Sequence, residues 1–449
     1  MRKILIVGGG YAGFYTAWKL EKWLRPGEAE VTLVDPLPYM TYEPFLPEVL
    51  AGSIEARHSV IALRRHLKTT NVVSAKATYI DHANKTATLT SEGESWPFPY
   101  DVVVVTAGAV SRSFPIPGVA DEAIGLKTIE EAIAIRDHLL GNFDLAATLP
   151  PGPERDRLLT VTFVGGGYAG IEGFGELRSF ATALLKFYPQ LKLEDTHFHL
   201  VEATGRVLPE VSLKTSHWVL ANLAERQAQV HLNTQLVSAV DGNIELSTGE
   251  KYASDILIWT AGVKPNPSVV KHTDLPLEGR GRIQVRADLR VGTEDHIVED
   301  AWSAGDVAAV PDLSGDGVNG FAVPNAQHAV RQGKLLARNL LAVLRGEEPR
   351  PYLHHNQGSV ATLGLGIGVF QSKHVVVKGF PAWVMHRGYH GLAIPTWERK
   401  WRVVGDWWGS LWLGRDIVSL PGIESPRAAF EEFADRPPAT ASAETSAER

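Results

Sequence analysis

The sequence contains the same six-residue glycine turn twice, GGGYAG at residues 8–13 and again at residues 165–170. Each copy follows a short apolar run, precedes a segment suited to a helix, and is followed by a second apolar run that ends in an acidic residue. GxGxxG spacing allows a tight turn, close approach of the backbone to a pyrophosphate, and close packing of helix on strand. Because a helix N-terminus favours an anion, the sequence predicts two dinucleotide-binding units.

The first unit reads as a strand over residues 3–7, a helix over residues 14–23, and a second strand, EVTLVDP, that ends in Asp35. A carboxylate at this distance from the turn can accept a hydrogen bond from a ribose hydroxyl. The glycines that we assign to this turn are Gly8, Gly10 and Gly13.

The second unit repeats this order, with the strand LTVTFV, a helix from Ile171, and the strand HFHLVEA, which ends in Glu202. A carboxylate at Glu202 would repel a 2′-phosphate, which favours NADH over NADPH. The alternative is that Glu202 only caps a loop. The glycines that we assign to this turn are Gly165, Gly167 and Gly170.

Two later segments also match each other: YDVVVVTAG at residues 100–108 and SDILIWTAG at residues 254–262. Each places a buried-type strand before small residues that let the backbone approach a nucleotide. A further segment, EDAWSAGDVA, places Gly305 and Asp306 at a strand-to-helix turn. The small residues that we predict to contact nucleotides are Thr106, Ala107, Gly108, Ala261 and Gly262.

Composition excludes several classes of protein. The net charge of -7 and the lack of a basic tract argue against nucleic-acid binding. The absence of cysteine excludes disulfides, thiolate metal sites and iron-sulfur clusters. The spacing of His354 with His355, and of His386 with His390, predicts no metal site. The apolar run at residues 4–7 is too short for a secretory signal, and no stretch approaches the roughly 20 residues of a membrane span.

Together these motifs resemble the two-dinucleotide flavoprotein superfamily that includes the disulfide reductases. The resemblance implies FAD on the first glycine turn, NAD(P)H on the second, and Asp306 on the flavin ribitol. It also implies that Glu172 matches a family acid near the nicotinamide and the flavin. The alternative is that Glu172 is a first-turn helix acid stabilised by the helix dipole.

The lack of cysteine excludes the superfamily branches that relay electrons through thiols, so the flavin must reduce an external acceptor directly: quinone, a small iron-sulfur protein or oxygen. The segments at residues 39–54 and 324–333 resemble type II NADH dehydrogenases, the second matching their quinone-site helix. The resemblance implies that Gln327 contacts quinone and that Lys378 lies near the flavin, but Arg331 stands where that family has a second glutamine. Alternatively, Gln327 and Arg331 are polar residues on a surface helix.

Six of the 12 tryptophans fall between residues 383 and 412. A helix over residues 397–412 would place four of these tryptophans, with Val404 and Leu411, along one face. Such a face, flanked by Arg399, Lys400 and Arg402, is typical of a helix lying in a membrane interface. A dimer interface or an internal packing face is the alternative.

We therefore expect an α/β fold with two Rossmann-like domains and a C-terminal, membrane-facing segment. The expected function is a non-proton-pumping, FAD-dependent NADH:quinone oxidoreductase that uses menaquinone or ubiquinone at the cytoplasmic side of the membrane, either as a monomer or as a homodimer. The alternatives are a reductase of a ferredoxin-like protein, an NADH oxidase, or an NADH-binding flavoprotein of the apoptosis-inducing-factor kind. The expected divisions are residues 1–120 and 270–350 for FAD, 121–269 for NADH, 351–435 for the C-terminal segment, and 436–449 for a disordered tail.

Overall fold

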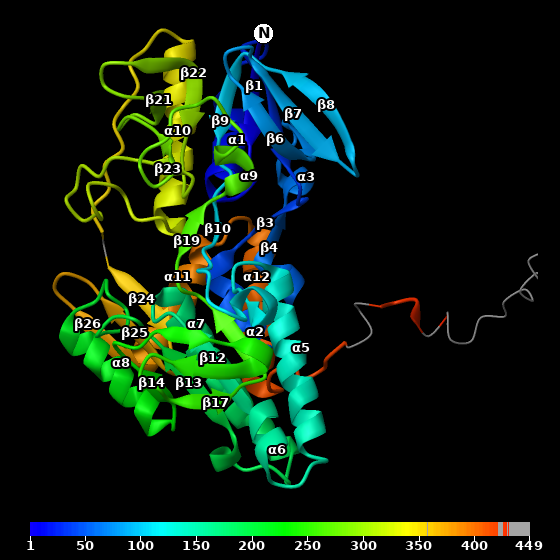
Figure 1. The fold of residues 1–449 in the computed structure, drawn as a ribbon. Helices are drawn as coiled ribbons and strands as arrows, with labels where there is room; N and C mark the ends of the chain where they lie inside the picture. The colour runs from blue at the N-terminus through cyan, green and yellow to red at the C-terminus, as the bar shows by residue number, and fades with distance from the viewer. Residues whose placement is uncertain (357, 421–424, 429, 431–449) are drawn as a thin grey trace, which may run out of the picture.

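The computed structural model describes residues 1–356, 358–420, 425–428 and 430. Two sheets form its upper and lower halves in Figure 1, each built around one glycine turn. The predicted disordered tail, residues 436–449, lies outside the described residues.

The first sheet has six strands in the order β21-β22-β9-β1-β2-β5. All neighbours are parallel except the edge strand β21, and the central strands are almost wholly apolar because helices and loops cover both faces. Its strands are β1 (Arg2–Val7), β2 (Ala29–Asp35), β5 (Asn71–Ser74), β9 (Val102–Val105), β21 (Arg290–Gly292) and β22 (Ile297–Ser303).

The second sheet has five parallel strands in the order β11-β18-β12-β13-β14. The strands are β11 (Ala123–Ile124), β12 (Thr160–Val164), β13 (His197–Val201), β14 (Gln229–His231) and β18 (Ile256–Trp259), and the long helices associated with them are α5 (Ile129–Ala146), α7 (Tyr168–Leu184) and α8 (Leu213–Glu225).

The two sheets share one plan. In the first, β1 leads through the glycine turn into α1 (Tyr11–Trp23) and lies between β2 and β9. In the second, β12 leads into α7 and lies between β13 and β18. The fold predicted from the repeated motifs, two Rossmann-like units, is confirmed.

The chain passes between the sheets on two neighbouring strands, β10 (Ala109–Ser111) and β19 (Val263–Pro265), which pair antiparallel. The first sheet thus contains strands that precede the second sheet in the sequence and strands that follow it. The domain boundaries given above stay a prediction. Each half also carries an antiparallel three-stranded sheet, formed by β6 (Lys76–Asp81), β7 (Thr86–Ser91) and β8 (Glu94–Pro99) in the first half and by β15 (Leu236–Ser238), β16 (Asn243–Leu246) and β17 (Lys251–Ala253) in the second.

Helix α10 (Ala326–Leu344) packs closely against α1. A Cβ atom at Gly333 would lie 2.5 Å from the carbonyl oxygen of Ala12, so only glycine lets the helices approach this closely. The hydroxyl of Thr16 donates to the carbonyl of Gly333 across the same contact (3.1 Å). This packing places the start of α10 beside the first glycine turn.

The C-terminal segment comprises a three-stranded sheet and two helices, drawn in yellow-orange to orange in Figure 1, with the sheet beside the lower half and the helices between the two halves. The predicted helix at residues 397–412 is confirmed as α12. No helix in the described part of the chain is both long enough and apolar enough to cross a membrane. The elements are β24 (Ser359–Thr362), β25 (Gly368–Gln371), β26 (Val376–Gly379), α11 (Phe380–Ala393) and α12 (Trp397–Trp412).

The polar side of α12 faces the protein body, which the amphipathic pattern alone did not reveal. Asp406 contacts Nδ1 of His58 (2.6 Å), and Val403 is buried. The tryptophan face points outward, with Trp401 72% and Trp408 65% exposed, which excludes internal packing of that face within the monomer.

The other short α-helices and strands of the described chain are β3 (Tyr39–Thr41), α2 (Leu46–Leu50), β4 (Val60–Ala62), α3 (Leu63–His66), α4 (Val119–Glu122), α6 (Pro153–Leu158), α9 (Pro267–Val270), β20 (Ile283–Gln284) and β23 (Ala308–Ala309).

Candidate functional site

The first glycine turn depends on contacts that leave no room for side chains. Gly8 has φ of +103°, and a Cβ atom at Gly13 would lie 1.8 Å from the carbonyl oxygen of Gly8. The hydroxyl of Thr106 donates to the same carbonyl (2.9 Å) and to that of Val7 (3.1 Å). Thr106 therefore fixes the turn from the neighbouring strand, and Ala107 and Gly108 follow it at the strand end.

The second turn reproduces this geometry. Gly165 has φ of +111°, and a Cβ atom at Gly170 would lie 1.9 Å from the carbonyl oxygen of Gly165. The hydroxyl of Thr260 donates to Val164 (2.9 Å) and to Gly165 (3.1 Å), before Ala261 and Gly262 at the end of β18. Thr260 was not among the predicted site residues, although the repeated TAG segment contained the signal for it.

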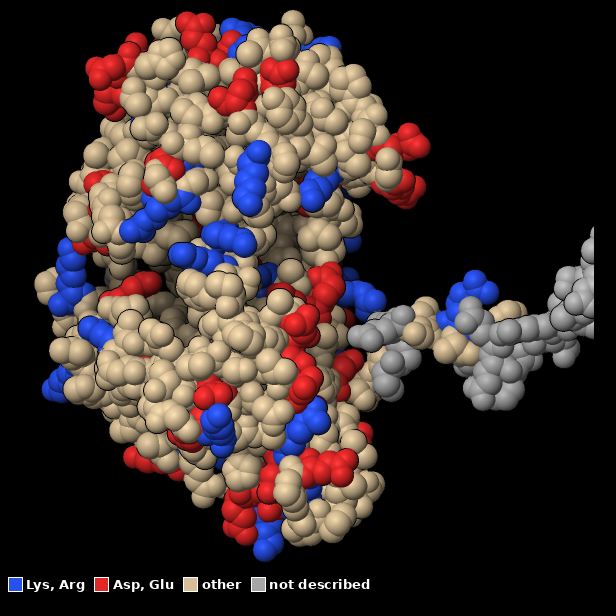
Figure 2. Space-filling model, viewed as in Figure 1, with Lys and Arg blue, Asp and Glu red and all other residues tan. Residues whose placement is uncertain are grey.

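Both turns can accept a pyrophosphate. Gly10 and Gly167 are the N-caps of α1 and α7, neither helix has a side-chain cap, and a Cβ atom at either glycine would meet nothing within 4 Å. No side chain therefore caps either helix N-terminus, which leaves it available for an anion. In Figure 2, a hollow opens between the two halves, and basic side chains border it.

The two predicted ribose acids lie over these turns in equivalent positions. The N–H of Gly9 donates to Oδ2 of Asp35 (2.6 Å), and the N–H of Gly166 donates to Oε2 of Glu202 (2.6 Å). Burial raises the pKa of Asp35 above its usual value, while hydrogen bonds from the backbone N–H groups of Gly9 and Leu37 oppose the shift. Glu202 therefore does more than cap the following loop, because it also contacts the glycine turn.

Asp306 lies beside the first turn, after Gly305, which has φ of +77°. Burial raises the pKa of Asp306 to about 6, and the nearby Lys127 ammonium opposes that shift. The N–H of Gly305 donates to Oε1 of Gln332 (2.8 Å), and Lys127 forms an ion pair with Glu43 (3.1 Å). Lys127 and Gln332 were not predicted as site residues, because their role depends on α10 and the segment just before α5 meeting this turn.

Glu172 is buried in the second turn of α7, at the contact with the C-terminal segment. Its Oε1 accepts from the N–H of Thr362 (3.0 Å) and lies 3.1 Å from Nε2 of His386. Burial raises the pKa of Glu172 to about 8 and lowers that of His386 to about 3, so the proton resides on the carboxyl group at neutral pH. A solvated helix-dipole acid would have neither the burial nor these partners.

Two further buried acids surround Glu172, and the sequence did not predict them. Glu48 of α2 pairs with Arg387 of α11 (3.1 Å), and Glu176 of α7 pairs with Arg415 (3.1 Å). Burial raises the pKa of Glu48 to about 7, against the field of Arg387. The cluster thus joins both nucleotide-binding halves to the C-terminal segment.

The predicted acceptor-side residues occupy two places. On α10, the side-chain oxygen of Gln327 contacts Nε2 of His354 (3.1 Å), and Arg331 donates to the carbonyl of Gln327 (2.8 Å). Lys378, on β26, lies over the ring of Trp218 of α8, 5.3 Å from its centre. Lys378 therefore shares none of these contacts with Gln327 and Arg331.

Comparison with known proteins gives a consistent result. The family model for pyridine nucleotide-disulphide oxidoreductases matches residues 2–333. A probable NADH dehydrogenase of Dictyostelium discoideum is 26% identical over 428 residues, covering 93% of this chain and 91% of that protein. A type II NADH:quinone oxidoreductase of Mycobacterium tuberculosis is 28% identical over 407 residues, covering 86% and 84%.

Solved structures share the fold. NDH2 from Plasmodium falciparum in complex with NADH superposes with a TM-score of 0.84 at 18% identity, covering 93% of this chain and 99% of that chain. A water-forming NADH oxidase from Lactobacillus brevis bound to NADH superposes with a TM-score of 0.65 at 21% identity, covering 82% and 75%.

The position of Glu202 predicts a preference for NADH. Replacing Glu202 with alanine removes both the ribose acceptor and the repulsion of a 2′-phosphate. We expect the ratio of kcat/KM for NADH to that for NADPH to fall by about tenfold or more, which is roughly 1.4 kcal/mol of discrimination. The control is Glu225→Ala, at an exposed acid of α8. A wild-type protein that uses both nucleotides equally would contradict the assignment.

The raised pKa of Glu172 predicts a pH-dependent stability. Because the folded-state pKa of about 8 lies above the unfolded value of about 4.5, the proton stabilises the folded protein fully below about pH 4.5. This contribution is lost as pH rises toward 8, by at most about 1.4 kcal/mol per pH unit. We expect the Tm of the wild type to fall, relative to that of Glu172→Gln, between about pH 5 and pH 9. A constant difference would exclude the raised pKa.

Proposed function

The chain belongs to the pyridine nucleotide-disulphide oxidoreductase family, and we propose that within it the protein is a type II NADH dehydrogenase that reduces a quinone. As a member of this family it is an oxidoreductase whose cofactors are FAD and NADH. We assign FAD to the first glycine turn with Asp35 and Asp306, and NADH to the second with Glu202. The names of the relatives from Dictyostelium and Mycobacterium support the proposed activity.

The observation that carries the quinone proposal is the outward tryptophan face of α12. Trp397, Trp401, Trp408 and Trp412 are each between 65% and 73% exposed, while the opposite side of the helix is attached to the protein body. The ammonium of Lys400 lies 5.3 Å from the ring centre of Trp397, an arrangement suited to the headgroup layer of a membrane. A quinone is a lipid-soluble acceptor, so it would reach the protein from this side.

The absence of cysteine supports direct transfer to an external acceptor. When bound, FAD accepts the hydride of NADH and passes on the two electrons. Quinone reduction then consumes NADH, one proton and quinone, and yields NAD⁺ and quinol. Glu172, protonated at neutral pH and buried between α7 and the C-terminal segment, is the chain's own group best suited to hold that proton.

Gln327 and Arg331 are the proposed quinone-side residues on α10. A fixed guanidinium charge beside an apolar ligand is costly unless it is paired. The Arg331 guanidinium donates to the carbonyl of Gln327, which partly satisfies it on its own helix. We further propose that the protein is a peripheral protein of the cytoplasmic membrane surface, and that a homodimer is the alternative use of the tryptophan face.

The proposed acceptor is tested by anaerobic stopped-flow measurements. The FAD-loaded protein is reduced with NADH and mixed with menaquinone or ubiquinone analogues in detergent. We expect flavin reoxidation that is fast and saturates with quinone concentration. A reduced flavin that ignores quinone and reacts instead with oxygen or with a ferredoxin-like protein would exclude the proposal, and a long-lived reduced complex would favour an NADH-binding signalling protein.

The same assay tests the role of Arg331. If the arginine only adds desolvation cost, Arg331→Gln lowers the KM for quinone several-fold and leaves the rate of flavin reduction by NADH unchanged. A higher KM in this variant would show that Arg331 itself binds quinone.

Membrane attachment is tested by replacing the outward tryptophans. We expect Trp401→Ser combined with Trp408→Ser to reduce sedimentation with anionic liposomes at least tenfold, because about 150–250 Å² of apolar area is lost per tryptophan. NADH-dependent dye reduction should be unchanged, because neither side chain contacts the nucleotide turns. The matched control is Leu213→Ser, at a 57% exposed site on α8. Undiminished liposome binding together with a change from dimer to monomer would assign the face to a dimer interface.

A further inference from the structure

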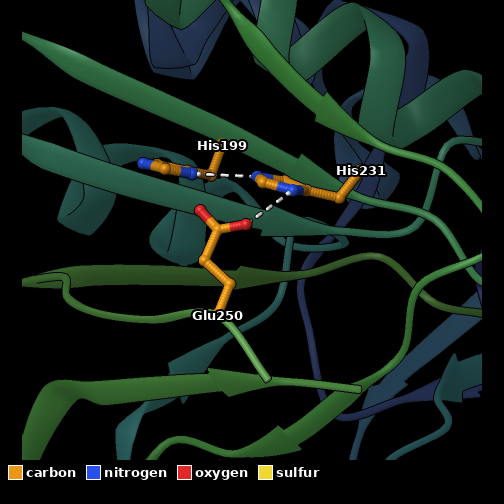
Figure 3. A group of neighbouring side chains, drawn as sticks. All are labelled: His199, His231 and Glu250. Carbon is orange, nitrogen blue, oxygen red and sulfur yellow. Dashed lines mark hydrogen bonds and ion pairs between the residues drawn. The ribbon is translucent and has the colours of Figure 1, made fainter. Parts of the chain in front are cut away.

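A second group of chemically active side chains lies on the NADH-binding half and includes none of the residues assigned to the two glycine turns. Among the described residues, His199, His231 and Glu250 are the only three such side chains whose ligand atoms all lie within 4.8 Å of one another. Figure 3 shows the two imidazole rings end to end, with the carboxylate beneath the gap between them. Neither the nucleotide assignments nor the proposed quinone reaction uses this group.

The backbone fixes the positions of all three residues. His199 lies on β13. Val201 follows two residues later on the same face of the sheet, and it is paired in register with His231 at the end of β14. The two histidines are therefore neighbours on one face of the sheet. Glu250 comes from the turn between β16 and β17, on the separate three-stranded sheet. The group therefore bridges two sheets that no strand pairing joins.

The three side chains lie close together, and an aromatic ring stacks on one of them. Nδ1 of His199 lies 3.0 Å from Nε2 of His231, and Nδ1 of His231 lies 3.5 Å from Oε2 of Glu250. The ring of Tyr252 stacks on that of His199, with centres 3.9 Å apart and planes at 16°. The carboxylate near Nδ1 of His231 favours the tautomer with the proton on that nitrogen, in which the Nε2 lone pair is directed toward His199.

Burial keeps the inner imidazole neutral. The pKa of His199 is lowered to about 3, first by burial and then by the neighbouring His231. A neutral imidazole can act as a metal ligand without first losing a proton to the solvent. The side chain of Glu250 is 44% exposed, so the group is open to solvent on the carboxylate side.

We propose that His199, His231 and Glu250 bind one divalent transition-metal ion of the Zn²⁺ class. Two nitrogens at about 2.0–2.1 Å from a tetrahedral Zn²⁺ lie about 3.3 Å apart, so the observed 3.0 Å needs to open by only a few tenths of an ångström. The two rings are nearly coplanar, at 6°, so each must also tilt until both lone pairs point to the side of Glu250. The His199 proton then resides on Nε2, and no proton is released.

The donor set selects the class of ion. Two imidazole nitrogens and one carboxylate suit Zn²⁺, with water in the remaining position, whereas Ca²⁺ and Mg²⁺ prefer oxygen ligands throughout. An ion here would fasten the three-stranded sheet to the ends of β13 and β14. It would also stabilise the strand end that holds Glu202, whose N–H donates to the carbonyl of His231 (2.9 Å). The three residues are far apart in the sequence, so no local spacing of histidines predicts this group.

The test uses the full-length, FAD-loaded protein without a histidine tag, after treatment with a chelator and in a buffer that does not bind metals. Zn²⁺ binding is measured by titration calorimetry and by the rise in Tm, and Co²⁺ is used as a spectroscopic probe of tetrahedral coordination. The variants are His231→Gln, which removes a ligand, and Glu250→Gln, which changes an exposed side chain and should not disturb folding. The control is His217→Gln, an exposed histidine on α8.

We expect one Zn²⁺ site in the wild type and in the control that is lost in His231→Gln and weakened at least about tenfold in Glu250→Gln. In His231→Gln, the Zn²⁺-dependent rise in Tm and the Co²⁺ absorption bands should disappear together with the site. Equal Zn²⁺ affinity and stoichiometry in the wild type and both site variants would overturn the proposal. Lack of any Zn²⁺ binding in the wild type would overturn it as well and would leave the group as a structural hydrogen-bonded stack. Neither result bears on quinone reduction.

Discussion

Three carboxylates, Glu48, Glu172 and Glu176, are buried where the two nucleotide-binding halves meet the C-terminal segment, and two guanidinium groups face them. Because an unpaired buried charge is expensive, this arrangement requires at least one acid to keep its proton, and the raised pKa values of Glu48 and Glu172 agree with that requirement. The C-terminal segment supplies the opposing charges. It is therefore part of the folded core of the enzyme, and removing it would leave acids of both halves without partners.

The two nucleotide sites obey a second constraint, the close approach of each glycine turn to the neighbouring strand. In both, a threonine hydroxyl from that strand holds the carbonyl of the first glycine, and an acid from the next strand accepts from the turn. The repetition extends to distances within a few tenths of an ångström. The different ligands that we propose for the two turns must then be selected by residues outside the repeated pattern, such as Asp306 and α10 at the first turn.

Sequence reasoning succeeded where a signal is local. The turns, the ends of β2 and β13, and the helix at residues 397–412 follow from residue spacing over one or two elements. It did not find Gln332 or the pairing of Glu48 with Arg387, because contacts between different elements that are apart in the sequence leave no local pattern. Thr260 was overlooked although the repeated TAG segment contained its signal. The amphipathic pattern of α12 was recognised, but not which side faces the protein, because that depends on His58 and Glu48 reaching its polar side.

The polar side of α12 faces the protein and its tryptophan side faces outward. Ionic strength therefore acts on the two sides of the helix in opposite ways. Toward the body the helix is held partly by charge contacts, such as that of Asp406 with His58, which dissolved salt screens. Toward the outside it offers indole rings, whose apolar association is unaffected or strengthened by salt. A wash in concentrated salt, the usual means of releasing proteins held to lipid by charge alone, would therefore leave the proposed membrane attachment in place. Detergent, which competes for the indole surface, would release it.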